Sequence, residues 1–246
     1  SENISNAQIY DGIQQMNDDF SMTNSDNGNT ISAFQGVIGN ADIQFKLATK
    51  DPNGNCHSGI TRTYSNTTYD TGISFQNGNH PIVDAVSAQH GIWQQQKYLN
   101  IFVCIDPDGA AGYTLKPSTF IPATSMYGGI IVRDDYFGTI GTSNIGRRHT
   151  LSHEAGHWLN LSHCWGNTNS PGDAANCSSD DGISDTPETI GSNLVCNLNA
   201  TTCGSLDNVQ NIMEYSYCST MFTQGQVGFM HTALNSNTAG RNNLWT

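Results

Sequence analysis

The stretch that most constrains this chain is residues 153–163, which read HEAGHWLNLSH. His153 and His157 are four residues apart, so on an α-helix both imidazoles project from one face. Two imidazoles placed in this way can hold one zinc ion, and Glu154 beside them can act as a base for a metal-bound water. The spacing therefore predicts a helix with a metal site on one face.

His163 completes the ligand set only if the helix stops and the chain turns back. On a straight helix its offset from His157 corresponds to about 240° of rotation, which points the ring away. Asn160 lies where the break is needed, and Asn is the residue after Gly that best tolerates a left-handed backbone. Three histidines leave a fourth position for water, as in catalytic zinc sites. A helix with incidental histidines is the alternative, which the third histidine disfavours.

Composition restricts the partners of the chain. Its 246 residues can bury a sizeable core, as one large domain or as two lobes about a cleft. Hydrophobic residues make up only 36%, so much of the surface should be irregular. The formal charge of −12, without a basic stripe, disfavours nucleic acid as a partner. Because no apolar run approaches the ~20 residues that cross a bilayer, no membrane partner is expected.

The cysteines indicate an oxidising compartment. Seven occur without any Cys-x-x-Cys pair, so a zinc-finger type of site is not indicated. Four crowd the polar region after the histidine motif, namely Cys177, Cys196, Cys203 and Cys218. This crowding favours disulfides and an extracellular protein. The chain begins at Ser1 without a signal peptide, so we expect a mature, processed or trimmed form.

Three further helices are predicted besides the histidine helix. Apolar residues at helical spacing cover residues 4–20, with Ser5 as the N-cap. A second helix is expected from Pro81 toward Gln96, since proline suits the first turn. The last is expected to start near Thr223 and to run to about Leu234.

Four apolar stretches predict strands, at residues 43–48, 98–105, 112–116 and 129–133. The third of them stops at Pro117, which makes it a candidate edge strand.

His149 lies one turn before His153. If His149 were a ligand together with His153, the pair His153 and His157 with Glu154 between them would not be used. We therefore interpret His149 as a structural residue or a support for the ligands.

A later segment, NIMEY at residues 211–215, adds a second motif. With it the chain resembles the metzincin metalloendopeptidases, and among them the pappalysin family, whose members read HExxHxxGxxH and then carry a Met-turn. The likeness includes the segments at residues 99–103, 112–113, 180–187 and 221–223. There are two departures from the family pattern. Asn160 replaces the usual Gly, and the chain begins after the first strand that family members usually have.

The resemblance implies an α+β fold of the metzincin type. A twisted, mostly parallel sheet with a backing helix and an active-site helix would lie above a cleft, and an irregular lower lobe with a C-terminal helix would close it. We expect residues 1–246 to form a single catalytic domain and a monomer. Residues 1–163 would be the upper subdomain with the zinc helix, and residues 164–246 the lower subdomain with the Met-turn.

The resemblance also implies a secreted zinc-dependent endopeptidase that hydrolyses peptide bonds of protein substrates through a zinc-bound water. Glu154 would take the proton of this water and pass it to the leaving amine. Tyr215 would stabilise the tetrahedral intermediate, unless it is only a packed aromatic residue. Met213 would form an apolar floor under the imidazoles. Two alternatives stay open: a catalytically silent zinc-containing binding module, and a zinc hydrolase acting on a non-peptide amide.

The substrate is expected to lie extended along the edge strand and to add a strand to it. Its contacts would come from Gly112, Tyr113, Thr114 and Leu115. The pocket for the residue after the cleaved bond would be bounded by Ser216 and Tyr217. Family members that prefer Arg or Lys there carry aspartates in this segment, and this chain has none. We therefore expect no strict preference for Arg or Lys.

The family pattern further implies two interlaced disulfides, Cys177–Cys203 and Cys196–Cys218. A third, Cys56–Cys104, would join two residues that each follow a predicted strand, and Cys164 would stay unpaired. The resemblance also implies a calcium ion near Asp181, Asp185 and Thr186, whose oxygens and neighbouring glycine suit a hard cation. An ordinary solvated acidic loop is the alternative.

Overall fold

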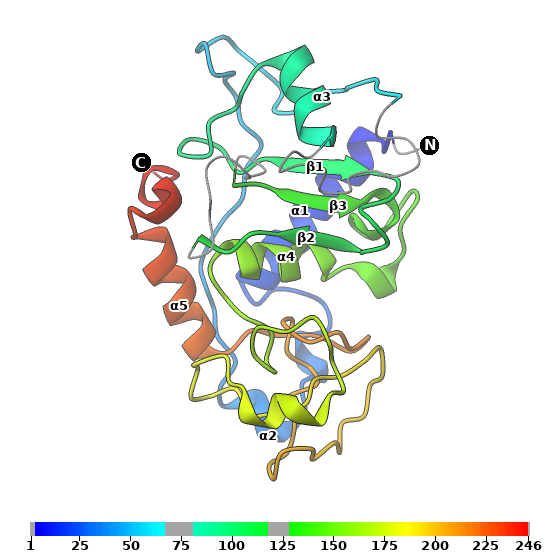
Figure 1. The fold of residues 1–246 in the computed structure, drawn as a ribbon, viewed down its shortest axis with the longest axis vertical. Helices are drawn as coiled ribbons and strands as arrows, with labels where there is room; N and C mark the ends of the chain where they lie inside the picture. Colours follow the sequence, from blue (N-terminus) through cyan, green and yellow to red (C-terminus); the bar gives the residue numbers. More distant parts are fainter. Residues whose placement is uncertain (1–2, 67–80, 118–127, 246) are drawn as a thin grey trace.

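The structure is a computed structural model that describes residues 3–66, 81–117 and 128–245. A small sheet and the helices around it form the upper part of the molecule in Figure 1, and irregular loops form the lower part. Helix α5 (Gln224–Leu234) runs along the side of both. Within the described residues, no helix is long and apolar enough to span a membrane. The expected combination of a sheet, helices and an irregular lower region is confirmed.

Within the described residues, the sheet has three strands in the order β1-β3-β2. Strand β1 (Ile101–Cys104) pairs in parallel with β3 (Ile130–Arg133), and β2 (Gly112–Thr114) pairs antiparallel with the other side of β3. Ile131 of β3 lies opposite both Phe102 and Tyr113. In the described part of the chain, β2 is therefore an edge strand, as predicted.

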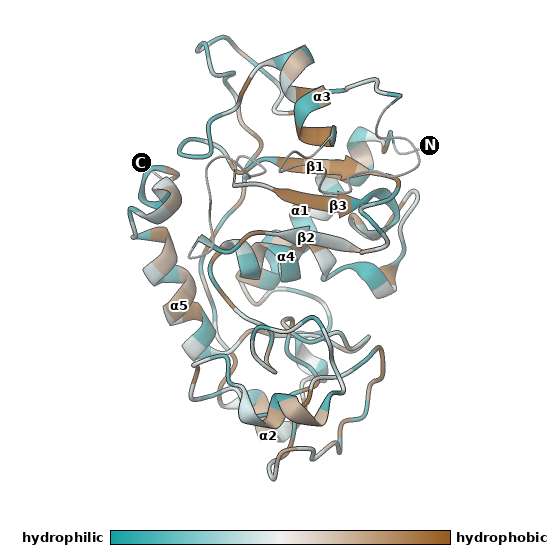
Figure 2. Cartoon of the chain, in the orientation of Figure 1, coloured by the Kyte–Doolittle hydropathy of each residue, from teal (hydrophilic) through white to brown (hydrophobic). Residues whose placement is uncertain are grey.

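Both faces of the sheet are covered, which explains why its strands read as continuous apolar runs. Ile130 and Val132 pack into the main core with helix α4 (Thr150–Trp158) and helix α1 (Asn6–Phe20). Ile131 and its neighbours on the other face pack against helix α3 (Pro81–His90). Figure 2 shows β1 and β3 as strongly hydrophobic strands. The sheet is thus a rigid platform above the histidine helix.

The strand predicted at residues 43–48 is not formed. The side chain of Asn17 takes the place of a neighbouring strand, because it bonds both backbone groups of Phe45. Its Oδ1 accepts from Phe45 N at 2.7 Å, and its Nδ2 donates to Phe45 O at 3.0 Å. The Phe45 ring also packs edge-on against Phe20, with centroids 5.1 Å apart. This segment is therefore held by helix α1 as an extended chain outside the sheet.

Helix ends follow their local signals. Ser5 caps α1 by accepting from Gln8 N at 3.1 Å, as predicted. Thr223 and Gln226 form a capping box at the start of α5. Helix α3 begins at Pro81, as predicted, but ends at His90 rather than near Gln96. The helix ends there because Gly91 adopts a left-handed backbone conformation, with φ at 73°.

The lower part is mostly loop and is held by two disulfides. The expected bridges Cys177–Cys203 and Cys196–Cys218 are both present. The expected bridge between Cys56 and Cys104 is wrong. Cys104 is buried in the sheet and Cys56 is exposed, because the strand that should have brought Cys56 toward the sheet is not formed.

Short helices complete the fold. Helix α2 covers Ser32–Gln35, and its neighbourhood lies with the lower part, because Asn24 Nδ2 donates to Thr220 O at 2.9 Å and Ile38 bridges to Thr223. The 3₁₀ helices lie at Asn27–Asn29, Asp134–Tyr136, Ile145–Arg147, Ala174–Ser178 and Thr238–Asn243.

Candidate metal centre and active site

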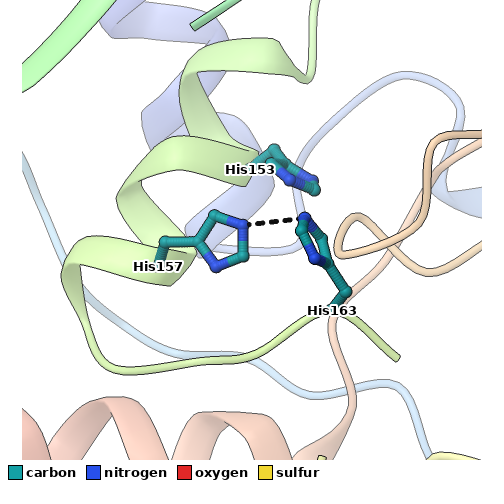
Figure 3. Close-up of side chains that lie close together, drawn as sticks. All are labelled: His153, His157 and His163. Carbon is teal, nitrogen blue, oxygen red and sulfur yellow. Dashed lines mark hydrogen bonds between the residues drawn. The ribbon is translucent and has the colours of Figure 1, made fainter. Parts of the chain in front are cut away.

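Three imidazoles converge at the end of helix α4 (Figure 3). His153 and His157 come from one face of the helix, and the chain then turns at Asn160, whose φ is 75°. The left-handed conformation predicted for Asn160 is thus confirmed. The turn is closed by a bond from Leu161 N to Gly156 O at 3.0 Å. It carries His163 back, so that one ligand atom from each histidine lies within 4.8 Å of the others.

Each imidazole is oriented by a backbone carbonyl. His153 Nδ1 lies 2.7 Å from Ile212 O, His157 Nδ1 lies 2.8 Å from Leu161 O, and His163 Nδ1 lies 3.0 Å from Thr168 O. A ring that donates from Nδ1 to a carbonyl keeps a lone pair on Nε2 when it is neutral. All three lone pairs are then free to bind a metal ion.

The spacing of two of these lone pairs fits a cation. His157 Nε2 and His163 Nε2 lie only 3.1 Å apart. With both Nδ1 atoms donating, neither Nε2 carries a proton, so the two lone pairs would repel each other unless a cation lies between them. Burial lowers the pKa of His153 to about 4 and that of His157 to about 3, which keeps both rings neutral. Three neutral imidazoles are a ligand set that zinc prefers.

Glu154 lies beside the histidines and under the edge strand. Its side chain is buried, and burial raises its pKa to about 8. A Cβ atom added to Gly112 of β2 would lie only 3.4 Å from Glu154 Oε1, so the backbone of β2 passes close over the carboxylate. Glu154, His157 and His163 all line one cleft of about 340 Å³, together with residues 112–116. The predicted base and the predicted edge strand are thus brought together.

Met213 and Tyr215 close the site from below. Met213 is fully buried, and a Cβ atom added to Gly156 of α4 would lie 2.5 Å from its Sδ. The Tyr215 ring lies 5.4 Å from the ring of His153 and 4.9 Å from that of His163. Burial, with a contribution from the Glu154 charge, raises the pKa of Tyr215 to about 12. Its phenol therefore keeps a proton that it can donate.

His149 belongs to a different cluster. Its Nδ1 lies 2.9 Å from Asp19 Oδ2 of helix α1, and its Nε2 lies 3.0 Å from Asp26 Oδ2. Burial disfavours the charged ring, but the two carboxylates outweigh this effect and raise the pKa of His149 to about 9. His149 is thus an imidazolium that ties α4 to α1, which agrees with its interpretation as a structural residue.

The two carboxylates expected to bind calcium, Asp181 and Asp185, have different protein partners. Asp181 accepts from Thr186 Oγ1 at 2.8 Å and from Ile183 N at 2.9 Å. Asp185 accepts instead from Thr223 Oγ1 at 2.6 Å, at the start of α5. Among the residues that the structure describes, the three histidines are the one group of three or more His, Cys, Asp or Glu placed to hold a metal ion.

Two residues of the site were missed by sequence reasoning. Trp165 stacks on His163 with ring centroids 4.3 Å apart and an interplanar angle of 3°, and its Nε1 donates to Thr168 O at 2.9 Å. Lys116 lines the cleft just beyond β2. The signals were present, since Trp165 follows the third histidine closely and Lys116 is the last residue of the predicted edge segment. Neither position is distinctive without knowing how the loops fold back.

Comparisons with known proteins extend these observations. A family model, peptidase M43, described as pregnancy-associated plasma protein-A, matches residues 81–235. An extracellular metalloprotease of Colletotrichum graminicola is 35% identical over 130 residues, which are 49% of this chain and 44% of that protein. One of Uncinocarpus reesii is 32% identical over 136 residues, 52% of this chain and 45% of that protein. The match thus spans less than half the length of these curated relatives.

Solved structures of mirolysin from Tannerella forsythia match nearly the whole chain. A promirolysin mutant superimposes with a TM-score of 0.84 at 36% identity, covering 99% of this chain and 79% of that chain. Mature mirolysin in complex with a cleaved peptide superimposes with a TM-score of 0.78 at 35% identity, covering 98% and 89%. At 35–36% identity, this chain is similar to mirolysin in sequence as well as in fold.

Proposed function

The chain belongs to the peptidase M43 family, and on that premise we propose that it is an extracellular zinc-dependent endopeptidase that cleaves protein substrates. The observation that carries the proposal is the convergence of three carbonyl-oriented imidazoles beside a buried glutamate, directly under an edge strand. The two disulfides support the extracellular location. So do the relatives named extracellular metalloproteases.

The chemistry follows from the positions of the side chains. A zinc ion held by His153, His157 and His163 would polarise the scissile carbonyl and lower the pKa of a water molecule toward ~7. Glu154, whose burial gives it a high affinity for a proton, accepts the proton of the attacking water and delivers it to the leaving amine. The phenol of Tyr215 donates a hydrogen bond to the oxyanion that develops.

The substrate lies along β2. This strand pairs with β3 on one side, so the other side can receive an extended peptide through main-chain hydrogen bonds. The backbone from Gly112 to Leu115 makes these contacts, directly above Glu154. A site of this form favours a peptide over a small non-peptide amide. The mirolysin structure that contains a cleaved peptide supports the same conclusion.

We also infer that residues 1–246 act as one catalytic domain and as a monomer. Residues 1–163, apart from the segment around α2, would lie above the cleft, and residues 164–246 below it. One continuous core supports the first inference. It includes Leu151 from the histidine helix together with Ile183 and Phe222 from the lower part.

Removal of zinc tests the proposed function directly. The protein is incubated with a denatured protein substrate before and after treatment with a zinc chelator, and zinc is then added back. We expect cleavage to be lost on chelation and restored by zinc, because the three imidazoles have no other role in the site. Cleavage that persists after the metal has been removed would contradict the proposal. A zinc-loaded protein that cuts no peptide would favour the silent binding module.

The residue after the cleaved bond is expected to be neutral rather than strictly cationic. Glu214 is buried, and its Oε2 accepts from Ser192 N at 2.7 Å, so it is not among the residues that line the cleft. The Ser216 hydroxyl donates to the carbonyl of Val209. Among the described residues that line the cleft, Glu154 is the one carboxylate, so a cationic side chain would find no second carboxylate there. One apolar contact discriminates by only ~1–3 kcal/mol. Cleavage of a mixed peptide library measures this preference, and near-exclusive cutting before Arg and Lys would refute it.

We propose that calcium binds near Asp181, Asp185 and Thr186. Burial raises the pKa of Asp181 to about 7, with a further contribution from Asp180, so a nearby divalent cation would stabilise the ionised form. Calcium should then raise the thermal stability by mass action. The midpoint of thermal unfolding is measured after exhaustive calcium removal and after readdition, for the natural chain and for Asp181→Asn. A midpoint that does not respond to calcium in the natural chain would rule the site out.

A further inference from the structure

A lysine lies in the cleft of this acidic protein. Lys116 follows β2, and its amino group donates to Ser162 Oγ at 3.0 Å and to Asn167 Oδ1 at 2.5 Å. Ser162 directly precedes the third histidine, so these bonds hold the ammonium group at the cleft wall beside His163. Among the described residues that line the cleft, Lys116 is the one lysine or arginine and Glu154 is the one carboxylate.

The surroundings of Lys116 favour an anionic group. The side-chain oxygens of Ser162 and Asn167, to which it donates, are uncharged. Lys116 is half-buried, and this burial lowers its pKa because it disfavours the charged form. A partly desolvated cation gains most from a carboxylate, since charge-assisted bonds are roughly twice as strong as neutral ones. The whole chain has a formal charge of −12, so an acidic substrate has few other places to bind.

The direction of the edge strand determines on which side of the cleaved peptide bond Lys116 lies. Gly112 of β2 lies directly over Glu154, and the strand runs from there toward Thr114 and Lys116. A peptide that adds to β2 in the antiparallel sense runs the opposite way. Its residues before the cleaved bond then lie toward Lys116, within about four residues at ~3.4 Å each.

We propose that Lys116 determines specificity by binding an aspartate or glutamate side chain on the N-terminal side of the cleaved bond. This inference rests on the peptidase function proposed above and deepens it by naming a class of substrate. Ser162 and Asn167 hold the amino group in place, and the extended substrate presents its carboxylate from the opposite side of the cleft.

Matched peptides test the proposal. Each pair differs by Glu or Gln at one of the four positions before the cleaved bond or of the four after it. For the natural chain we expect kcat/KM to be about tenfold higher for Glu at one position before the bond, as for a single charge-assisted contact. The preference should shrink as the salt concentration rises, because ions screen a partly exposed charge.

Three variants connect the preference to one side chain. Lys116→Met should abolish the preference for Glu and still cleave the Gln peptides, and Lys116→Arg should retain the preference. Lys97→Met is the matched control, since it removes the same charge from an exposed position outside the cleft and should leave the preference unchanged. The Kd of each peptide for Glu154→Gln, with and without Lys116→Met, gives the same comparison without catalysis.

The outcomes separate this inference from the proposed function. Equal cleavage and equal binding of Glu and Gln peptides by the natural chain would refute the role of Lys116 and leave the peptidase function intact. So would a preference that survives in Lys116→Met or one found only after the cleaved bond. Failure of the zinc-loaded chain to cut any peptide would instead refute the peptidase function, and the binding comparison would then decide the role of Lys116 separately.

Discussion

Replacing Glu154 with Gln is expected to lower kcat/KM by about 10²–10⁴-fold, the usual contribution of a positioned general base. The amide has the size of the carboxylate and fits the same buried space under β2, but it cannot accept the proton of the attacking water. The three imidazoles keep their carbonyl partners, so the variant should still bind one zinc ion. Cleavage of a single peptide, together with metal analysis, measures both quantities.

Glu188→Gln is the matched control for this variant. It makes the same chemical change at an exposed position outside the cleft and should retain full activity. Full activity of Glu154→Gln with zinc bound would remove Glu154 from the reaction. Loss of zinc from Glu154→Gln would show that the carboxylate supports the metal site rather than the proton transfer.

Removing the Cys196–Cys218 disulfide is expected to destabilise the protein by about 3 kcal/mol, the loop-closure value for a bridge of this span. The two residues are separated by 22 positions, and the bridge ties a loop to the segment that follows the Met-turn. For a chain of this size, the midpoint of thermal unfolding should fall by about 6–12 °C. Calorimetry of the double variant Cys196→Ala, Cys218→Ala measures this shift.

Cys56→Ser is the control for loss of a cysteine as such, because Cys56 is exposed and forms no disulfide. Its midpoint should stay within about 2 °C, since exposed substitutions usually change stability by less than 0.5 kcal/mol. The double variant should also lose activity at lower temperature, because the Met-turn carbonyl of Ile212 orients His153. An unchanged midpoint in the double variant would mean that the Cys177–Cys203 bridge and the hydrogen bonds hold the lower part without the second bridge.

The local signals of the sequence determined the metal site almost completely. Helical periodicity places His153 and His157 on one face, and the left-handed tolerance of Asn160 allows His163 to return, with φ at 75°. The cap at Ser5 and the start of the last helix near Thr223 were also predicted from local sequence. All of these depend on interactions between residues only a few positions apart, so a short stretch of sequence contains the whole physical cause.

The pairing of the strands was decided by tertiary structure. The segment at residues 43–48 has the alternation of a strand, yet the side chain of Asn17 satisfies the backbone of Phe45 and keeps it outside the sheet. Cys56 is then exposed and forms no disulfide. Alternation shows only that one face of a segment is apolar, and it does not say which distant group will satisfy its backbone.

The direction of charged side chains was likewise decided by the folded chain. Glu214 precedes the proposed catalytic Tyr215 in sequence, but its Oε2 accepts from Ser192 N and it is not among the residues that line the cleft. Lys116 follows the edge strand without a distinctive motif, yet it enters the cleft because the loop after the histidine helix offers it Ser162 and Asn167. Sequence determines which charges a chain carries, whereas their orientation depends on contacts between segments far apart in the chain, which only the packed structure supplies.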